Sequence, residues 1–415
     1  MTRYLADFVD RHELRVRYQS RATGISADPI GYAVSFSDAP PVRARRVVIA
    51  TGVEPYRPDI PGIDLVERYA DLATDPSEFH AARVLIIGKG NSAFETASAL
   101  IPVAATVHLA SPSPVRLAWN THYVGHVRAV NCNAIDTYQL KIGNALLDAE
   151  VTGIRRDGTG FHVDLAYTHA GGQRVTYQYD RVIAATGFRF GAHDLLTGLG
   201  GQTCHDGRYP AMTPDYECPD RPGLYFAGTL THARDYRKAM SGFIHGFRYN
   251  SRFLARLLTA AGDLAPQCRI DVDAATLAQW VLDRLNTSDA LYLQPGYFAD
   301  VAAATDPDQT DLGVYEAVPL DWVRDGGLGS GWQLAVTLAY GPPAADPLNV
   351  DRRDDPSYAD VTPYLHPVIR LRHAGVDTAE LHLLEELENR YRPEEHLPRL
   401  TSFLRSALPV ESVVS

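Results

Sequence analysis

The sequence predicts an α/β protein in which one dinucleotide-binding-type domain is inserted into another, followed by an α+β region. Three observations support this fold class. Strands and helices alternate between residues 83 and 110, a glycine-rich turn joins the first of these strands to its helix, and three apolar strands elsewhere end in the same small residues. Alternating strands and helices are typical of parallel sheets covered by helices.

The opening residues predict a helix over 4–9 and then two alternating strands, at 16–19 and 32–37. Residues 45–50 form a continuous apolar run, which is typical of a strand buried on both faces. A proline-rich passage follows, with Pro55, Pro58 and Pro61, and indicates a crossing between domains.

The next segment predicts a buried strand at 83–87, a helix at 92–100 and a second strand at 106–110. A small antiparallel meander is expected at 161–165 and 175–177, with Gly171 and Gly172 in its turn. Further strands are expected at 181–185 and 223–228, and a long helix at 242–258. We therefore expect four segments: 1–75 and 191–262 forming an outer domain, 76–190 forming the inserted domain, and 263–415 forming a C-terminal cap or interface domain.

Composition excludes several classes of function. The 415 residues include 39 basic and 50 acidic side chains, giving a net charge of −11, which disfavours nucleic acid and anionic membranes as partners. No apolar run approaches the length of a membrane span, and the first residues lack a secretory pattern, so a cytoplasmic protein is expected. Four distant cysteines without a Cys-x-x-Cys pair exclude a zinc ribbon, a disulfide scaffold and a thioredoxin-type centre, and no metal is expected.

The glycine-rich turn GKGNSAFE follows a strand and begins a helix, which is the setting of a dinucleotide fingerprint. Gly88 would make the tight turn, Gly90 would let the backbone approach a diphosphate, and Ala93 would replace the third glycine. The helix amino end, with Asn91 and Ser92, would hold the diphosphate through backbone amides. The alternative is a tight strand–helix turn that binds no ligand.

The end of the second strand indicates which dinucleotide binds. No acid lies between Glu95 and Asp136, whereas an acid about 20 residues past the glycines usually meets a free ribose 2′-hydroxyl. The strand ends instead in Ser111 and is followed by Arg116, a hydroxyl and a guanidinium that suit a 2′-phosphate. We therefore expect NADPH rather than NADH. The alternative is that Arg116 only solvates a loop.

Three strand ends share small residues and surround this fingerprint along the sequence. They are Thr51-Gly52, Thr186-Gly187 and Gly228-Thr229. Together they form the skeleton of flavoproteins whose FAD domain is interrupted by an NADPH domain. In that architecture the strand ending at Gly228 passes the ribityl chain. The helix beginning at Gly242 and Phe243 directs its positive end at the flavin ring.

An FAD domain of this kind also needs a glycine fingerprint at its first strand. Before residue 83 the only glycines are Gly24, Gly31, Gly52 and Gly62, and no two have the required spacing. The first βαβ unit of the FAD-type domain is thus missing, and an apolar strand edge would be exposed. We expect a separate small subunit to supply that unit, giving a heterodimer. The alternative is a truncated gene model.

With these residues assembled, the chain resembles the flavin-containing monooxygenase superfamily. The similar stretches are residues 88–97, 115–125, 136–141, 223–238, 243–249 and 364–369. The N-terminal FAD fingerprint of the family is the main departure. Residues 180–188 are also similar to the Ala-Thr-Gly box of N-hydroxylating monooxygenases, with Ala184 where Leu or Phe is usual.

The resemblance implies that NADPH reduces FAD and that the reduced flavin oxidises a small molecule, with N-hydroxylation as the expected reaction. Polar residues near the nicotinamide or flavin are then catalytic candidates: Asn120, His122, Tyr123, Arg234, Tyr236, Lys238 and His245. Alternatively, each of these side chains could make a purely structural hydrogen bond and take no part in catalysis. Two rival functions remain, a flavin reductase without oxygenation and a scaffold that has lost flavin binding.

Overall fold

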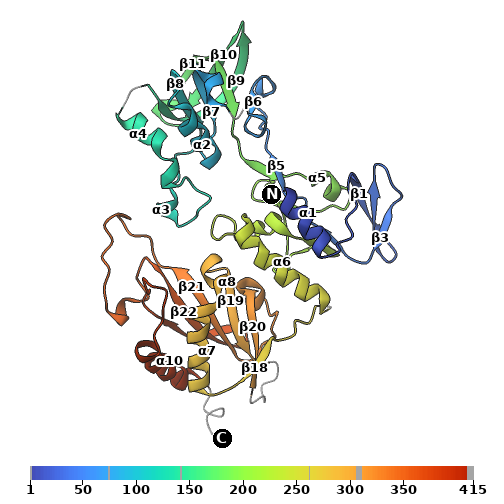
Figure 1. The fold of residues 1–415 in the computed structure, drawn as a ribbon, viewed down its shortest axis with the longest axis vertical. Helices are drawn as coiled ribbons and strands as arrows, with labels where there is room; N and C mark the ends of the chain where they lie inside the picture. The colour runs from blue at the N-terminus through green and yellow to red at the C-terminus, as the bar shows by residue number, and fades with distance from the viewer. Residues whose placement is uncertain (1, 73–74, 141–142, 261, 305–310, 409–415) are drawn as a thin grey trace.

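The computed structural model describes residues 2–72, 75–140, 143–260, 262–304 and 311–408. Figure 1 shows three parts along the long axis of the molecule. An upper domain holds the inserted segment, a central part combines the N-terminus with residues that follow the insertion, and a lower domain is formed by the C-terminal region.

The upper domain is a seven-stranded sheet in the order β11-β10-β9-β8-β7-β12-β6. Strands β6, β12, β7, β8 and β9 run parallel, and β10 and β11 form the antiparallel meander that the sequence predicts, joined on its other side by β9, which was not predicted. Its elements are β6 (Glu67–Arg68), β7 (Arg83–Ile87), α2 (Asn91–Leu100), β8 (Thr106–Ser111), α3 (Ala118–Thr121), α4 (Asn133–Leu140), β9 (Ala145–Asp157), β10 (Gly160–Tyr167), β11 (Arg174–Tyr179) and β12 (Arg181–Ala184).

Each face of this sheet has its own apolar core. In β7, Val84 and Ile86 point into the core that α2 covers, whereas Leu85 and Ile87 point into the core on the other face. Because both faces of the strand are covered, residues 84–87 are apolar without interruption.

Two short strands connect the upper domain to the central part. β5 (Val53–Pro55) leads upward, β13 (Phe188–Phe190) leads back, and the two pair antiparallel with Phe188 opposite Pro55. Ile63 and Val66 already pack in the core of the upper domain. The crossing therefore lies in the proline-rich passage, ahead of the expected boundary at residue 75.

The central part contains the small sheets β1-β2-β3 and β16-β17-β4, of which β17 and β4 are parallel, and the two-stranded pair β14-β15. Its elements are α1 (Thr2–Arg11), β1 (Ala22–Asp28), β2 (Gly31–Phe36), β3 (Val42–Ala44), β4 (Val47–Ile49), α5 (His193–Thr197), β14 (Thr203–Cys204), β15 (Tyr209–Pro210), β16 (Glu217–Cys218), β17 (Arg221–Phe226), the 3₁₀ segment η6 (Gly228–Ala233) and α6 (Ile244–Thr259).

The lower domain is a six-stranded antiparallel sheet in the order β18-β20-β19-β21-β22-β23. Helices α7 and α10 pack on one face, and the other face joins the core of the central part through residues such as Phe298 and Val301. Its elements are β18 (Cys268–Asp271), α7 (Ala274–Thr287), α8 (Asp289–Leu293), β19 (Phe298–Ala303), β20 (Asp311–Pro319), α9 (Leu320–Arg324), β21 (Gln333–Tyr340), β22 (Leu365–His373), β23 (Val376–His382) and α10 (Pro393–Ala407).

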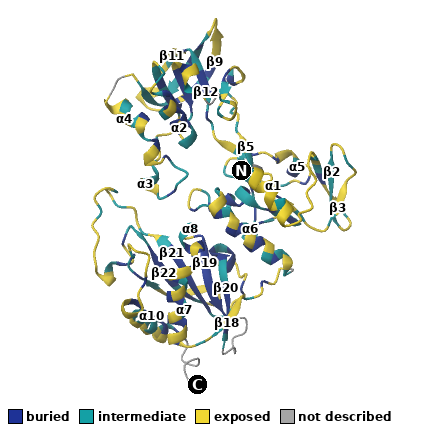
Figure 2. Ribbon diagram, viewed as in Figure 1, coloured by how far each residue is buried: buried dark blue, intermediate teal, exposed yellow. Residues whose placement is uncertain are grey.

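Three expectations differ from the structure. Residues 16–19 form no strand. Val48, in the strand expected to be buried on both faces, is 44% exposed, so one face of β4 is open at this residue while Ile49 is buried on the other. The long helix begins at Ile244 rather than at Gly242. Figure 2 shows the contrast between the buried strands of the upper and lower sheets and the exposed N-terminal region.

No helix in the described part of the chain has both the length and the apolar character needed to cross a bilayer.

Candidate functional site

A cleft of about 830 Å³ lies between the upper domain and the central part. The upper domain and its connections contribute Gly88, Lys89, Gly90, Ser111, Arg116, Tyr123, Thr186 and Gly187. The central part contributes Tyr209, His232, Tyr236 and Arg237. The cleft therefore begins at the glycine-rich turn and ends on residues that follow β17.

The glycine-rich turn has the backbone that a dinucleotide fingerprint requires. Gly88 has φ +134°, and a Cβ there would lie 2.2 Å from the carbonyl oxygen of Ala185. Gly90 precedes α2, and nothing lies within 4 Å of the position a Cβ would take. Ala93 is fully buried at the helix–strand contact. Since no side chain caps the amino end of α2, its first amides remain available to an anion.

Charged groups border the part of the cleft beside this turn. Lys89 is buried and pairs with Asp148 of β9, so its charge is already neutralised. Arg116 is exposed and makes no ion pair within the described residues. Ser111 lies at the end of β8, as the sequence predicts. Glu150 also lines the cleft, and sequence reasoning missed it because it belongs to the next strand.

Asn91 holds the loop that follows α3. Its amide nitrogen donates to the carbonyl oxygen of His126 at 2.8 Å, and its side-chain oxygen accepts from the backbone nitrogen of Arg128 at 3.1 Å. The same oxygen accepts from Asn131 at 3.1 Å. The Asn91 side chain therefore positions the loop that carries Tyr123, whereas its backbone lies at the start of α2.

Of the seven catalytic candidates, Tyr123 and Tyr236 line the cleft. Tyr123 is 8% exposed, and burial raises the pKa of its hydroxyl well above the usual value of 10. The Tyr236 ring packs 4.1 Å, centroid to centroid, from the ring of His205.

The other five candidates lie outside the cleft lining. Asn120 is exposed at the end of α3, and His122 stacks on Tyr340 of the lower domain at 4.3 Å between ring centroids. Burial lowers the pKa of His122. Arg234 donates through Nε to Asp321 at 2.8 Å.

Lys238 and His245, the last two candidates, are exposed. His245 stacks on Phe243 with 5.6 Å between ring centroids.

The expected flavin-binding strand ends meet one another. Gly52, with φ +72°, faces the methyl group of Thr229, and a Cβ there would lie 3.8 Å from it. The hydroxyl of Thr229 donates to the carbonyl oxygen of Gly242 at 3.1 Å. Gly228, with φ +68°, has open space where a Cβ would stand. Thr51 is exposed beside this group.

The amino end of α6 follows directly. Phe243 precedes the helix and no side chain caps the first turn, so the amides and the positive end of the helix dipole remain available. Gly246, in that first turn, has no room for a side chain, because a Cβ would lie 2.0 Å from the carbonyl oxygen of Met240.

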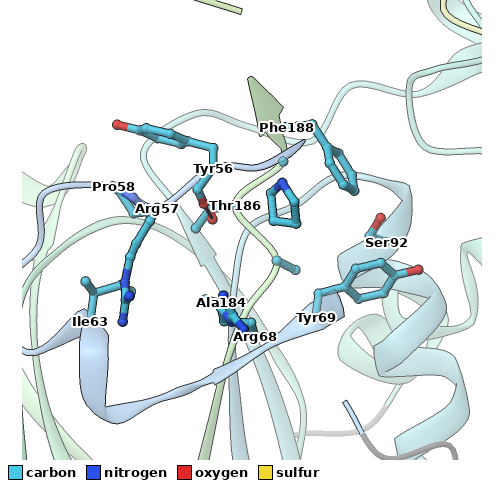
Figure 3. A pocket seen from close by; sticks show the side chains of 13 residues that line it. Tyr56, Arg57, Pro58, Ile63, Arg68, Tyr69, Ser92, Ala184, Thr186 and Phe188 are labelled. Carbon is cyan, nitrogen blue, oxygen red and sulfur yellow. Dashed lines mark hydrogen bonds between the residues drawn. The ribbon is translucent and has the colours of Figure 1, made fainter. Parts of the chain in front are cut away.

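A smaller pocket of about 60 Å³ lies beside the ends of β12 and β6 (Figure 3). Figure 3 shows Phe188, Ser92 and Tyr69 on one side and Tyr56 and Arg57 on the other. The hydroxyl of Thr186 donates to the carbonyl oxygen of Tyr56 at 2.5 Å, which ties the two crossing segments together. Ser92 thus lines this pocket rather than the large cleft.

All four cysteines are unpaired. Burial raises the pKa of Cys132, Cys204 and Cys218, which disfavours the reactive thiolate form.

In the lower domain, Glu386, Glu395 and His396 could hold a cation, since their ligand atoms lie within 4.8 Å of one another. Arg392 already pairs with Glu395 at 3.3 Å, and we assign no metal there.

His232, which lines the cleft, was also missing from the predicted site. It lies in the same run as Arg234 and Tyr236, and both His232 and the neighbouring Asp235 are almost fully buried. His232 and Asp235 stand three residues apart, shortly after a strand that ends in glycine. This pattern is a signal that could have identified them.

Comparison with known proteins adds the following. Residues 1–228 match the family model described as pyridine nucleotide-disulphide oxidoreductase. The chain is 32% identical to FAD-dependent oxidoreductase domain-containing protein 2 of Mus musculus over 97% of its own length, and 31% identical to the Danio rerio protein of that name over 88%. The matches span 65% and 61% of those relatives.

Among solved structures, bacillithiol disulfide reductase from Staphylococcus aureus aligns with a TM-score of 0.51 and 20% identity. The alignment covers 62% of this chain and 75% of that one. At this identity the likeness shows a shared fold alone.

Proposed function

The chain belongs to the pyridine nucleotide-disulphide oxidoreductase family, and from this premise we propose that it is an FAD- and NADPH-dependent oxidoreductase acting on a small molecule. The observation that carries the proposal is the single cleft lined by the dinucleotide turn on one side and by residues following β17 on the other. If the glycine-rich turn binds the diphosphate of NADPH, the nicotinamide would lie at the boundary with the FAD-type domain.

The upper domain fits NADPH. The amides at the start of α2 would bind the diphosphate, and Ser111 and Arg116 would bind a ribose 2′-phosphate. Because Glu150 borders the same cleft, its carboxylate would repel that phosphate. The relative affinity for NADPH and NADH therefore tests the assignment directly.

The central part fits one side of an FAD. Gly52, Gly228 and Thr229 leave open backbone at two neighbouring strand ends, and the uncapped start of α6 would face the flavin ring. When bound, FAD supplies the acceptor for hydride from NADPH. The protein holds it, orients it and keeps the surrounding side chains in place.

The free edge of β4 supports a further element of the proposal. A strand of the FAD diphosphate fingerprint would pair with β4 there, beside Val48. Helix α1 exposes Tyr4, Leu5 and Phe8 on the same part of the molecule. We place the fingerprint on a small second polypeptide, so that the chain is the large subunit of a heterodimeric flavoenzyme.

Monooxygenation is the finer proposal. The four cysteines are unpaired, and partial burial raises the pKa of Cys132, Cys204 and Cys218, so we favour electron transfer to dioxygen and a small substrate over dithiol exchange within the chain. N-hydroxylation rests on the Ala-Thr-Gly box at the end of β12. A flavin reductase would consume NADPH and release peroxide as its only product.

The decisive experiment is an absorption spectrum of the purified chain, alone and after co-expression with a small strand–Gly-x-Gly-x-x-Gly–helix protein. A flavin band near ~450 nm only in the complex supports the heterodimeric flavoenzyme. A flavin-saturated chain on its own contradicts the second subunit, and no flavin in either sample contradicts the oxidoreductase. NADPH consumption measured against peroxide release then separates oxygenation from simple reduction.

A further inference from the structure

Three buried side chains form a hydrogen-bonded chain in the wall of the cleft. The Tyr123 hydroxyl lies 2.9 Å from Nε2 of His232, and Nδ1 of His232 lies 2.9 Å from Oδ1 of Asp235. Tyr123 is 8%, His232 2% and Asp235 1% exposed, and the first two border the cleft. The three groups come from two segments more than 100 residues apart in the sequence.

The direction of these hydrogen bonds follows from their chemistry. A carboxylate only accepts hydrogen bonds, so Nδ1 of His232 carries the proton that faces Asp235. Nε2 is then an acceptor, and the Tyr123 hydroxyl donates to it. The second oxygen of Asp235 accepts from the backbone nitrogen of Ser241 at 3.0 Å, which fixes the carboxylate.

The imidazole has little freedom to turn. The Tyr123 ring stacks on it at 15° between planes, and Tyr209 and Tyr236 pack edge-on with 5.5 and 5.7 Å between centroids. Gly242 leaves the space for the ring, since a Cβ there would lie 3.2 Å from Cδ2 of His232.

The loop of Met240 and Ser241, which lies next to the imidazole in the fold, is also fixed by hydrogen bonds. The Nε2 amide of Gln294, from the lower domain, donates to the Ser241 hydroxyl at 2.8 Å, and its oxygen accepts from the Met240 backbone.

The charged surroundings of the imidazole can also be named. Asp235 lies at Nδ1, and the backbone nitrogen of Arg237 approaches Nε2 at 3.5 Å. His126 packs against Tyr123 with 5.1 Å between centroids. Burial raises the pKa of Tyr123, so a free phenolate is disfavoured and any proton that reaches this oxygen must be passed on.

We propose that Asp235, His232 and Tyr123 form a proton relay serving a reacting hydroxyl, amine or thiol bound in the cleft. The group X–H gives its proton to the Tyr123 oxygen while the tyrosine's own proton passes to Nε2 of His232. X keeps the bonding electron pair, and the imidazolium lies against the Asp235 carboxylate. The same chain run backwards returns one proton to an anion. Tyr123 is the catalytic residue and Asp235 is a positioning residue.

The relay rests on the proposed function, and its test separates the two. The ¹⁵N NMR spectrum of the histidines in the full chain is recorded from about pH 5 to 9 in wild type and in Tyr123→Phe and Asp235→Asn. We expect His232 to be the Nδ1–H tautomer in wild type and in Tyr123→Phe, and to populate both tautomers in Asp235→Asn. An Nε2–H tautomer in wild type, or the same tautomer population in Asp235→Asn as in wild type, overturns the relay whether or not NADPH binds.

The second readout is NADPH oxidation by the flavin-loaded protein with dioxygen as acceptor, which takes up one proton per turnover. We expect Tyr123→Phe to lower kcat by about 100-fold with the KM for NADPH changed less than about twofold. The matched control is Tyr179→Phe, which removes a buried tyrosine hydroxyl 2.9 Å from Nδ1 of His108 in the upper domain, away from the cleft. An unchanged kcat in Tyr123→Phe, or an equal loss in Tyr179→Phe, overturns the relay and leaves the proposed oxidoreductase standing.

Discussion

The upper domain and the central part are built from the same kind of strand but are completed in different ways. The upper sheet is seven strands wide and has a core on each face, drawn largely from residues 60 to 185. The central sheet β16-β17-β4 has three strands, an edge at β4 that pairs with no other described strand, and a core that continues into the lower domain. The difference teaches that the upper sheet is covered mainly by residues of its own domain, whereas the central sheet depends on the lower domain for part of its core.

The largest expected effect tests the shared core. Phe298, on β19, is fully buried against the central part, and Phe298→Ala should cost about 3–5 kcal/mol in the free energy of unfolding. Calorimetry with hydrogen exchange should show both the central and lower parts losing protection. Phe94→Ala in the upper domain is the control and should expose only that domain. If both variants lowered protection equally in all three parts, the upper domain would not have a core separate from the one that the central and lower parts share.

The next prediction concerns the glycine-rich turn. Gly88→Ala should destabilise the upper domain by about 3 kcal/mol and abolish NADPH binding, because its Cβ would meet the Ala185 carbonyl oxygen. Gly158→Ala, also at positive φ but with open space around it, should cost only about 1 kcal/mol and leave binding intact. Titration calorimetry and urea unfolding check both, and NADPH binding by Gly88→Ala would contradict the assignment of this turn.

A smaller effect should distinguish the two nucleotides. If Arg116 binds the 2′-phosphate as proposed, Arg116→Ala should weaken NADPH binding by about 10-fold to 100-fold while changing NADH affinity little, because one charged hydrogen bond would be lost. Arg128→Ala, an exposed cation that does not line the cleft, is the control. Equal losses for NADPH and NADH would mean that Arg116 acts on a part common to both.

The smallest effect lies at the amino ends of β7 and β12 in the upper sheet. Arg83 lowers the pKa of Asp180 to about 2 through hydrogen bonds to its side chain. A lowered folded-state pKa adds stability above the unfolded-state value of about 4, and this gain is lost as the pH falls through 2. Because Asp180 is 43% exposed, Asp180→Asn should cost less than about 1 kcal/mol at neutral pH. Urea midpoints measured from pH 7 to 2 should converge with wild type at low pH, and a gap that widens there would contradict the pairing.

The helices and strands of the upper domain follow from sequence because their signals are local. The apolar run of β7, the turn at Gly88 and the helix after Gly90 lie within 20 residues, and each agrees with the others. The strand expected at 16–19 is wrong, because alternation over four residues is too short to form a strand without a partner to pair with.

Candidate residues were harder to place than elements. Asn120 and His122 were assigned to the nicotinamide from their position after the second strand, yet the loop turns them toward solvent and toward Tyr340. Arg234 was expected near the flavin, but Asp321 of the lower domain binds it. The contacts of His122 and Arg234 are both made with the lower domain, and no local pattern in the sequence predicts them.

The sequence by itself determined the glycine-rich turn, the order of strands and helices around it and the three small-residue strand ends. These features depend on backbone conformation and apolar periodicity, which are set by residues close together in the chain. The tertiary structure decided that Tyr123 meets His232 and Asp235, that β19 completes the core beneath α6 and that one edge of β4 is free. These contacts join segments far apart in the chain. They depend on how whole sheets pack, and residue spacing does not specify that packing.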